Sequence, residues 1–148
     1  MLDSENKRTW SYSIAEMLIP KNNKQILGVN LAGTNIICID VDGTTKKHKT
    51  KLSKKKLQQL PNWLLNLPYT KSRNTQNPHF YCRVRNIPSW LKNKQTIHHS
   101  WNGINFDIMN VFIAEKKSAR IYNYNNLFPM ISARILEKLN NSAKYITK

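Results

Sequence analysis

The most informative stretch of this sequence is Ile36-Ile37-Cys38-Ile39-Asp40-Val41-Asp42-Gly43. It begins as an unbroken apolar run, which is typical of a strand buried on both faces of a sheet. Two acids then alternate with Val41 before Gly43 interrupts the pattern. Because residues two apart in a strand point to the same side, Asp40 and Asp42 should present their carboxylates together at the exposed end of this strand.

Shorter elements are expected on both sides of this strand. Leucines at helical spacing predict a helix over 53–67. Because Pro61 lies inside this pattern, two short helices are an equal alternative to one. We expect helices over 6–19, 53–67 and 130–139, strands over 25–30, 79–85, 105–108 and 111–115, a loop over 68–78 and a tight turn at 109–110. Without internal repeats or an interdomain linker, this order predicts one compact α+β domain over residues 1–148.

Charge is the strongest signal in the composition. The chain of 148 residues has a net charge of +16 and a pI near 10.1, which is typical of a protein that binds polyanions. The alternative explanation of the charge is a lysine- and asparagine-rich composition from an AT-biased genome. Seven lysines lie between Lys46 and Lys56, where they form either a solvated loop or a nonspecific contact to a nucleic-acid backbone.

The sequence also restricts where the protein functions. No apolar stretch is long enough to span a membrane, and the polar N-terminus does not resemble a secretory signal. Cys38 and Cys82 both lie in apolar runs, where cysteine usually acts as a small buried hydrophobe. We therefore expect an intracellular protein that is not secreted, has no membrane partner and has neither disulfides nor a zinc site.

The scarcity of acids makes the pair at Asp40 and Asp42 conspicuous. Two carboxylates this close repel each other, and a divalent cation relieves the repulsion. Between Met17 and Ser132 the only other acids are Asp107 and Glu115. Asp107 lies between apolar neighbours, as on a half-buried strand, whereas Glu115 leads into Lys116-Lys117-Ser118, a pattern typical of a solvated turn. We therefore expect Asp107 to be the third ligand; two solvated acids at a strand end are the alternative.

Basic and polar residues gather in the strand expected over 79–85. Phe80, Cys82 and Val84 alternate with His79, Tyr81, Arg83 and Arg85, which predicts an apolar face toward the core and a polar face toward solvent. Together with the preceding Lys71-Ser72-Arg73, this polar face is suited to bind phosphate oxygens. His98 and His99 have no cysteine or acid at ligand spacing nearby, so they do not indicate a zinc site.

Three of these segments, in this order, resemble the motifs of the archaeo-eukaryotic primase superfamily, and most closely its viral and plasmid primase–polymerase branch. The first is the acid pair that closes the strand at Asp40 and Asp42. The second is Ser72 followed by His79 at the start of a strand, and the third is Asp107 in an apolar strand followed by a hairpin. The likeness spans roughly residues 25–125. Many relatives have a glycine before the motif histidine, where this chain has Asn77-Pro78.

This resemblance implies a specific enzyme. The fold would be the primase–polymerase catalytic core, an RRM-like antiparallel sheet with an N-terminal αβ unit. Asp40, Asp42 and Asp107 would be catalytic and would hold two Mg²⁺ or Mn²⁺ ions, and Ser72, Arg73 and His79 would bind the triphosphate of the incoming nucleotide. We expect Lys71, Arg83 and Arg85 to contact nucleic acid.

The implied reaction is synthesis or extension of primers on a single-stranded DNA template from nucleoside triphosphates, during DNA replication. Relatives often carry a helicase domain, so a separate helicase is an expected partner. The resemblance also suggests a viral protein, acting in the cytoplasm, the nucleus or a viral replication site.

Two other functions are compatible with the same residues. Asp40-Val41-Asp42-Gly43-Thr44 also resembles the opening of the haloacid-dehalogenase-type phosphatase motif, in which Asp40 would accept the phosphoryl group and Asp42 would act as acid and base. That family needs a late acidic cluster that this chain lacks. The third possibility is a noncatalytic module that binds single-stranded nucleic acid by stacking bases on Tyr81, Trp90 or Trp101.

Overall fold

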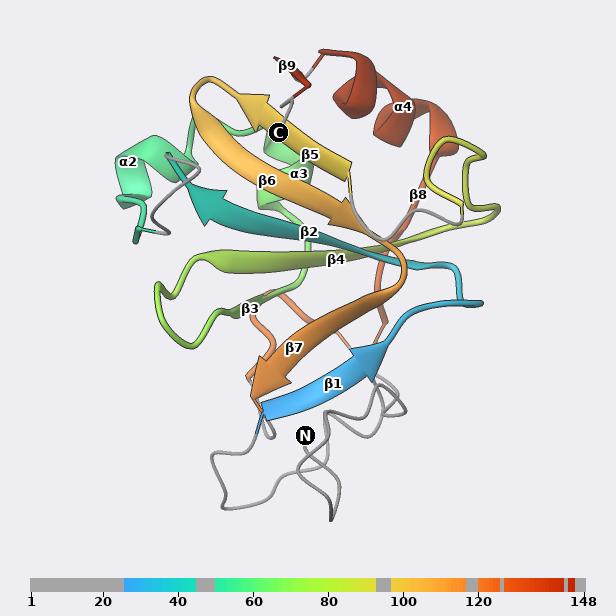
Figure 1. The fold of residues 1–148 in the computed structure, drawn as a ribbon, viewed down its shortest axis with the longest axis horizontal. Helices are drawn as coiled ribbons and strands as arrows, with labels where there is room; N and C mark the ends of the chain where they lie inside the picture. The colour runs from blue at the N-terminus through green and yellow to red at the C-terminus, as the bar shows by residue number, and fades with distance from the viewer. Residues whose placement is uncertain are drawn as a thin grey trace.

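A twisted, mainly antiparallel sheet forms the centre of the molecule (Figure 1). The computed structural model describes residues 26–44, 50–92, 97–116, 120–125, 127–142 and 144–145. In spatial order, the sheet contains β3 (Tyr69–Lys71), β4 (Pro78–Val84), β2 (Ile36–Gly43), β6 (Ile104–Met109), β5 (Ile97–Trp101) and β9 (Lys144–Tyr145), all joined antiparallel. The short β8 (Met130–Ile131) runs parallel to β4. Helices and antiparallel strands together confirm the mixed α and β composition expected from the sequence.

The apolar run around Cys38 forms the central strand, as its composition predicts. β2 lies between β4 and β6, and Ile37, Ile39 and Val41 are buried on one side of it. The strand predicted over 25–30 is β1 (Ile26–Asn30), and the strands predicted from periodicity correspond to β4, β6 and β7 (Phe112–Lys116) within one or two residues. The helix predicted over 6–19 lies outside the described residues.

Helices are shorter than the leucine pattern suggests. Pro61 does divide the predicted helix, because it caps α3 (Asn62–Leu65), which follows the separate helix α2 (Lys54–Leu57). The last helix, α4 (Ala133–Ser142), begins three residues later than expected because Met130 and Ile131 pair with β4. Among the described residues, no helix has the length and apolar character needed to cross a membrane.

The hairpin expected between β6 and β7 does not form, so that prediction was wrong. β6 pairs with β2 and β5, whereas β7 leaves the main sheet and pairs antiparallel with β1. Figure 1 shows β1 and β7 side by side as a separate ribbon. The turn between the strands is where predicted, but Leu31 and Ala32 donate backbone hydrogen bonds to Val111 and draw the chain toward β1.

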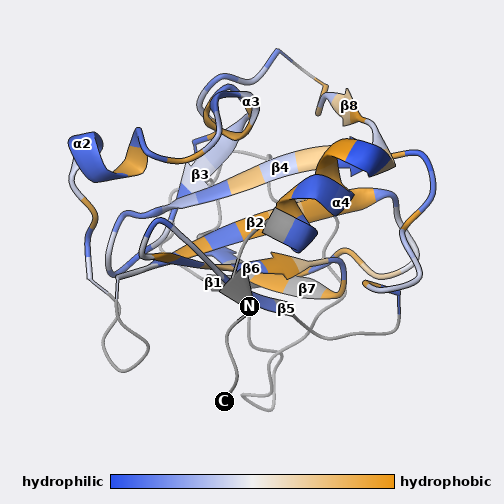
Figure 2. Ribbon diagram, turned by 90° about the horizontal axis from the view of Figure 1, so that it is seen from above, coloured by the Kyte–Doolittle hydropathy of each residue, from blue (hydrophilic) through white to orange (hydrophobic). Residues whose placement is uncertain are grey.

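Apolar residues cover both faces of the main sheet. One cluster packs the side of β2 that carries Ile37 and Ile39 against Leu64 of α3 and Leu136 of α4. Figure 2 shows hydrophobic residues concentrated on the central strands, and both hydrophobic and hydrophilic residues on α4. The helices therefore bury a single face of the sheet, as amphipathic elements do.

A second cluster covers the opposite face and corrects the predicted exposure of β4. Cys38 and Tyr81 pack there against Val29 of β1 and Ile113 of β7. Tyr81 is fully buried and His79 is 5% exposed, although alternation along β4 predicts a solvated polar face. The prediction was wrong because β1 and β7 cover this face, and local periodicity carries no signal for a second sheet.

Candidate metal centre and its polar surroundings

Three carboxylates converge near the end of β2, on the face of the main sheet that β1 and β7 cover. Asp40 lies directly opposite Asp107 in the register between β2 and β6. One oxygen from each of Asp40, Asp42 and Asp107 lies within 4.8 Å of the others, and all three residues are half-buried. The structure thus brings together the three acids that the sequence singles out; that they hold metal ions stays a prediction.

A bulge in β2 helps to place the second acid. The register with β6 shifts between Val41 and Gly43, so Asp42 is the extra residue on the β2 side. Gly43 has a φ of +135°, which side chains rarely tolerate, and a Cβ there would lie 3.0 Å from the backbone nitrogen of Thr50. The chain can therefore turn beside Asp42 only because residue 43 lacks a side chain.

His79 lies between two carboxylates. On β4 it stands opposite Asp40, and its Nε2 is 3.2 Å from Asp40 Oδ1. Its Nδ1 is 3.0 Å from Oε1 of Glu115 on β7. Burial lowers the pKa of His79, but the Glu115 charge and the hydrogen bonds to Asp40 and Glu115 outweigh this and raise the pKa from 6.5 to about 10. At neutral pH the ring therefore carries a proton on each nitrogen and donates to both acids.

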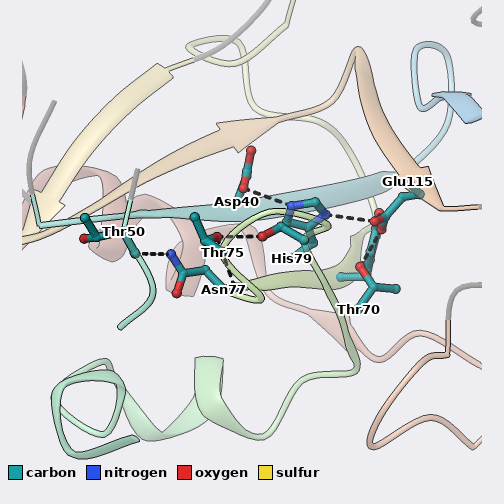
Figure 3. A network of polar contacts seen from close by, with 9 residues as sticks. Asp40, Thr50, Thr70, Thr75, Asn77, His79 and Glu115 are labelled. Carbon is teal, nitrogen blue, oxygen red and sulfur yellow. Dashed lines mark hydrogen bonds and ion pairs between the residues drawn. The ribbon is translucent and has the colours of Figure 1, made fainter. Parts of the chain in front are cut away.

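Glu115 is the functional candidate that sequence reasoning missed (Figure 3). It is 2% exposed rather than solvated, which corrects the surface turn predicted from the lysines that follow it. Besides His79, Glu115 accepts hydrogen bonds at Oε2 from Thr70 Oγ1, at 2.5 Å, and from the Tyr81 hydroxyl. Burial, and then the Glu115 charge, raises the pKa of Tyr81 well above 10, so the phenol remains a donor.

A sequence signal for Glu115 did exist. Ile113 precedes it by two residues in the same strand and is 5% exposed, so alternation places Glu115 on the buried side of β7. Lys116 and Lys117 outweighed that pattern in the prediction. A carboxylate on the buried side of a strand calls for partners, and three donors from β3 and β4 supply them.

His98 is a second histidine partner of the acidic cluster. It lies opposite Asp107 in the register of β5 and β6, and its Nδ1 is 2.5 Å from Asp107 Oδ1. No acid stands near His98 in the sequence, and the adjacent strand supplies one instead. Asp40 and Asp107 thus each contact a histidine from the neighbouring strand, which orients one oxygen of each carboxylate.

The residues assigned to the triphosphate lie in or beside the β3–β4 turn. The Ser72 hydroxyl is 2.7 Å from Thr75 Oγ1, and its backbone N–H donates to Asn77 at 2.9 Å. Arg73 is exposed in the same turn, while His79 is buried in the next strand. The structure places these residues on one hairpin without showing a nucleotide, so their assignment stays a prediction.

Asn77, two residues before His79, has a clear structural role. Its side chain is 1% exposed and binds the segment that follows the acid pair. Asn77 Oδ1 accepts from the Leu52 N–H at 2.8 Å, and its Nδ2 donates to the Thr50 carbonyl at 2.7 Å (Figure 3). These bonds hold residues 50–52 beside the β3–β4 turn.

The three residues that we expected to contact nucleic acid do not lie together. Lys71 Nζ lies 4.7 Å from the ring centre of Tyr122, and Arg83 Nε donates to the Phe128 carbonyl at 2.7 Å. Arg85 is exposed and lines a cavity of about 770 Å³ with Lys92, Asn35 and Asn86. This cavity lies beyond the start of β2, at the opposite end from Asp40 and Asp42.

The comparisons with known proteins add no assignment to this geometry. No protein-family model, curated protein or solved structure showed a significant match to this chain.

Proposed function

We propose that this chain is a metal-dependent nucleotidyltransferase of the primase–polymerase type, which synthesises or extends primers on single-stranded DNA. The observation that carries the proposal is the convergence of Asp40, Asp42 and Asp107 from two neighbouring strands. Their order along the chain, with Ser72 and His79 between them, is the order of the primase motifs. The strongly basic charge of the chain suits a nucleic-acid substrate.

The donor set fits Mg²⁺ or Mn²⁺. Both ions prefer oxygen ligands, and Mg²⁺ usually keeps several waters and substrate phosphates alongside one or two carboxylates. Asp40, Asp42 and Asp107 supply oxygen donors only, and their partial exposure leaves access for a substrate. When bound, divalent ions would lower the pKa of an attacking 3′-hydroxyl and neutralise charge on the leaving pyrophosphate.

The chain's own residues would mainly position the metal-binding aspartates and neutralise phosphate charge. His79 and His98 hold Asp40 and Asp107 in place through the contacts at 3.2 and 2.5 Å. Arg73, exposed in the β3–β4 turn, would bind phosphate oxygens of the incoming nucleotide. Phosphoryl transfer needs little covalent help from a protein, so these roles would suffice for catalysis.

The phosphatase alternative is less well supported by the contacts around Asp40. A covalent phosphoryl acceptor needs an available carboxylate oxygen, and because Asp40 Oδ1 accepts from a charged, buried histidine, only the other oxygen of Asp40 is left for that role. That hydrogen bond withdraws electron density from the would-be nucleophile. A noncatalytic binding module remains the alternative that the experiment below must separate.

The decisive measurement is incorporation of labelled nucleotides on single-stranded DNA with Mg²⁺ or Mn²⁺. Asp42→Asn should reduce incorporation more than about 100-fold, because it removes a direct ligand, and loss of an outer-shell partner already costs about 10- to 100-fold. Glu137→Gln is the matched control, since Glu137 is an exposed acid on α4. Its incorporation rate should equal that of the wild type.

Two results would oppose this proposal. Synthesis that persists in Asp42→Asn, or that persists in EDTA, would show that the three aspartates are not the catalytic metal site. Template binding without any synthesis in the wild type would favour the noncatalytic module.

A further inference from the structure

We propose that Glu115 is a positioning residue for the metal site, acting through His79 on Asp40. This inference rests on the proposed function, because it assumes that Asp40 is a metal ligand. It also gives His79 a different role from the triphosphate contact that the resemblance implies. The three side chains form one continuous line from β7 through β4 to β2 (Figure 3).

His79 has no ring nitrogen available for a nucleotide. Nδ1 contacts Glu115 at 3.0 Å and Nε2 contacts Asp40 at 3.2 Å, and the residue is 5% exposed. A triphosphate could reach either nitrogen only by displacing a buried carboxylate from it. The ring is therefore placed to orient the carboxylate of Asp40 through its Oδ1.

Glu115 is in turn held on both of its oxygens. Oε1 contacts His79, while Oε2 accepts from Thr70 at 2.5 Å and from Tyr81. Glu115 belongs to the β1–β7 ribbon, whereas Thr70, His79 and Tyr81 all belong to the main sheet. Its carboxylate thus sets the position of the imidazole relative to the sheet that carries Asp40.

Stability alone does not explain this arrangement. Taking charges out of water is costly, and well-packed apolar residues of similar volume often stabilise a protein as well as a buried ion pair does. The surrounding cluster of Val29, Ile113 and Tyr81 would accommodate apolar side chains. The buried charges instead lead to Asp40, which is half-buried and shares its site with Asp42 and Asp107. Partners of this kind orient metal ligands and raise metal affinity.

The test is the affinity for Mn²⁺, measured directly from the electron paramagnetic resonance signal of free Mn²⁺. Glu115→Gln is neutral and has one acceptor oxygen instead of two, so it cannot accept from His79 at one oxygen and from Thr70 and Tyr81 at the other. Its Kd for Mn²⁺ should rise about 10- to 100-fold, as is usual for outer-shell partners of metal ligands. Nucleotide incorporation should fall at low Mn²⁺ and recover at saturating Mn²⁺, a rescue that a purely structural defect would not show.

Two further variants keep the test decisive if Glu115→Gln does not fold. Tyr81→Phe and Thr70→Val each remove one hydrogen bond from Glu115 Oε2 and leave the Glu115–His79 contact intact. Each should raise the Kd for Mn²⁺ by a smaller factor, about 3- to 10-fold, below the range for losing a whole outer-shell partner. Leu136→Ala is the control, because it weakens the core beneath the opposite face and should leave the Kd unchanged.

The outcomes separate this inference from the proposed function. Wild-type affinity for Mn²⁺ in all folded variants of Glu115, Tyr81 and Thr70, with weakened binding in Asp42→Asn, would overturn the positioning role alone. Failure of the wild type to bind Mn²⁺, or binding that Asp42→Asn does not change, would overturn both proposals. A loss of affinity in Leu136→Ala as large as that in Glu115→Gln would show that the effect is only general destabilisation.

Discussion

At the scale of single residues, His79 and Glu115 are charged because each compensates the other. A carboxylate that is 2% exposed would be strongly destabilising alone, and so would an imidazolium that is 5% exposed. The contact of 3.0 Å between them, together with Asp40, reverses the effect of burial on the pKa of His79. The three residues are therefore joined by one continuous set of polar contacts.

This unit predicts how stability depends on pH in the metal-free protein. Because the pKa of His79 rises from 6.5 to about 10 on folding, its contribution is fully present below pH 6.5 and is lost as the pH rises toward 10. The free energy of unfolding, measured in urea with EDTA, should fall by on the order of 4 kcal/mol across this range. His79→Gln should lack this component, and equal pH dependence in the two proteins would contradict the assignment of charge to His79.

At the scale of elements, the regular geometry of β2 ends at Asp42 and Gly43, beside the candidate metal site. The bulge at Asp42 and the positive φ of Gly43 turn the chain toward Thr50, and Asn77 then fastens residues 50–52 by two hydrogen bonds. Bulges of this kind re-aim side chains at the ends of strands. The position of the second carboxylate therefore depends on the backbone of Gly43 as well as on Asp42 itself.

A pair of glycine variants tests this dependence. Gly43→Ala should destabilise the protein by about 1–3 kcal/mol, because its Cβ would lie 3.0 Å from the Thr50 nitrogen at a φ of +135°. It should also weaken Mn²⁺ binding by shifting Asp42. Gly33→Ala is the matched control: its φ is +77°, but nothing lies within 4 Å of the added Cβ, so only the backbone strain of about 1 kcal/mol applies.

Urea unfolding and Mn²⁺ titration of the two variants provide the measurement. Equal losses of stability in Gly43→Ala and Gly33→Ala would show that the close approach to Thr50 is relieved without cost. Unchanged Mn²⁺ affinity in Gly43→Ala would show that the bulge does not position the metal-binding carboxylates.

At the scale of the whole molecule, the chain has a net charge of +16, and two of its described basic residues, Arg85 and Lys92, line a concavity. Arg85 and Lys92 share the cavity of about 770 Å³ with the amides of Asn35 and Asn86, and Ile87 and Leu91 supply its apolar lining. Asn35, which lines the cavity, is five residues before Asp40, about 17 Å along an extended strand at 3.3 Å per residue. A nucleic-acid strand could therefore contact both regions.

Salt dependence of binding to single-stranded DNA tests this surface. The double variant Arg85→Ala/Lys92→Ala should bind more weakly, and its plot of log K against log salt should be shallower by about 1.4, since each phosphate contact contributes about 0.7. Arg134→Ala/Lys138→Ala removes the same charges from the exposed part of α4 and is the control. Fluorescence anisotropy across a salt series measures both, and equal changes would indicate that charge acts without a preferred surface.

Much of the architecture follows from local sequence patterns, and the errors in the predictions made from the sequence share one cause. The apolar run before Asp40 and the alternation around Asp107 are local signals, and both were confirmed; at Pro61, where one helix and two were equal alternatives, the structure has two. β3 and β5 were missed because short strands with polar residues such as His98 are stabilised by their neighbours rather than by their own composition. The exposure of Tyr81 was mistaken because β1 and β7, distant in sequence, cover it.

By itself, the sequence determined the central strand, the shared side of Asp40 and Asp42, and Asp107 as the acid most suited to join them, since these depend on strand periodicity and on the rarity of acids. Only the tertiary structure decided that Glu115 is buried, that His79 links it to Asp40, and that His98 contacts Asp107. Those contacts join residues 9 to 39 positions apart, and each pair lies on two different strands. Their partners are set by sheet register and by the packing of one sheet on another, and neither leaves a periodic signal in the chain.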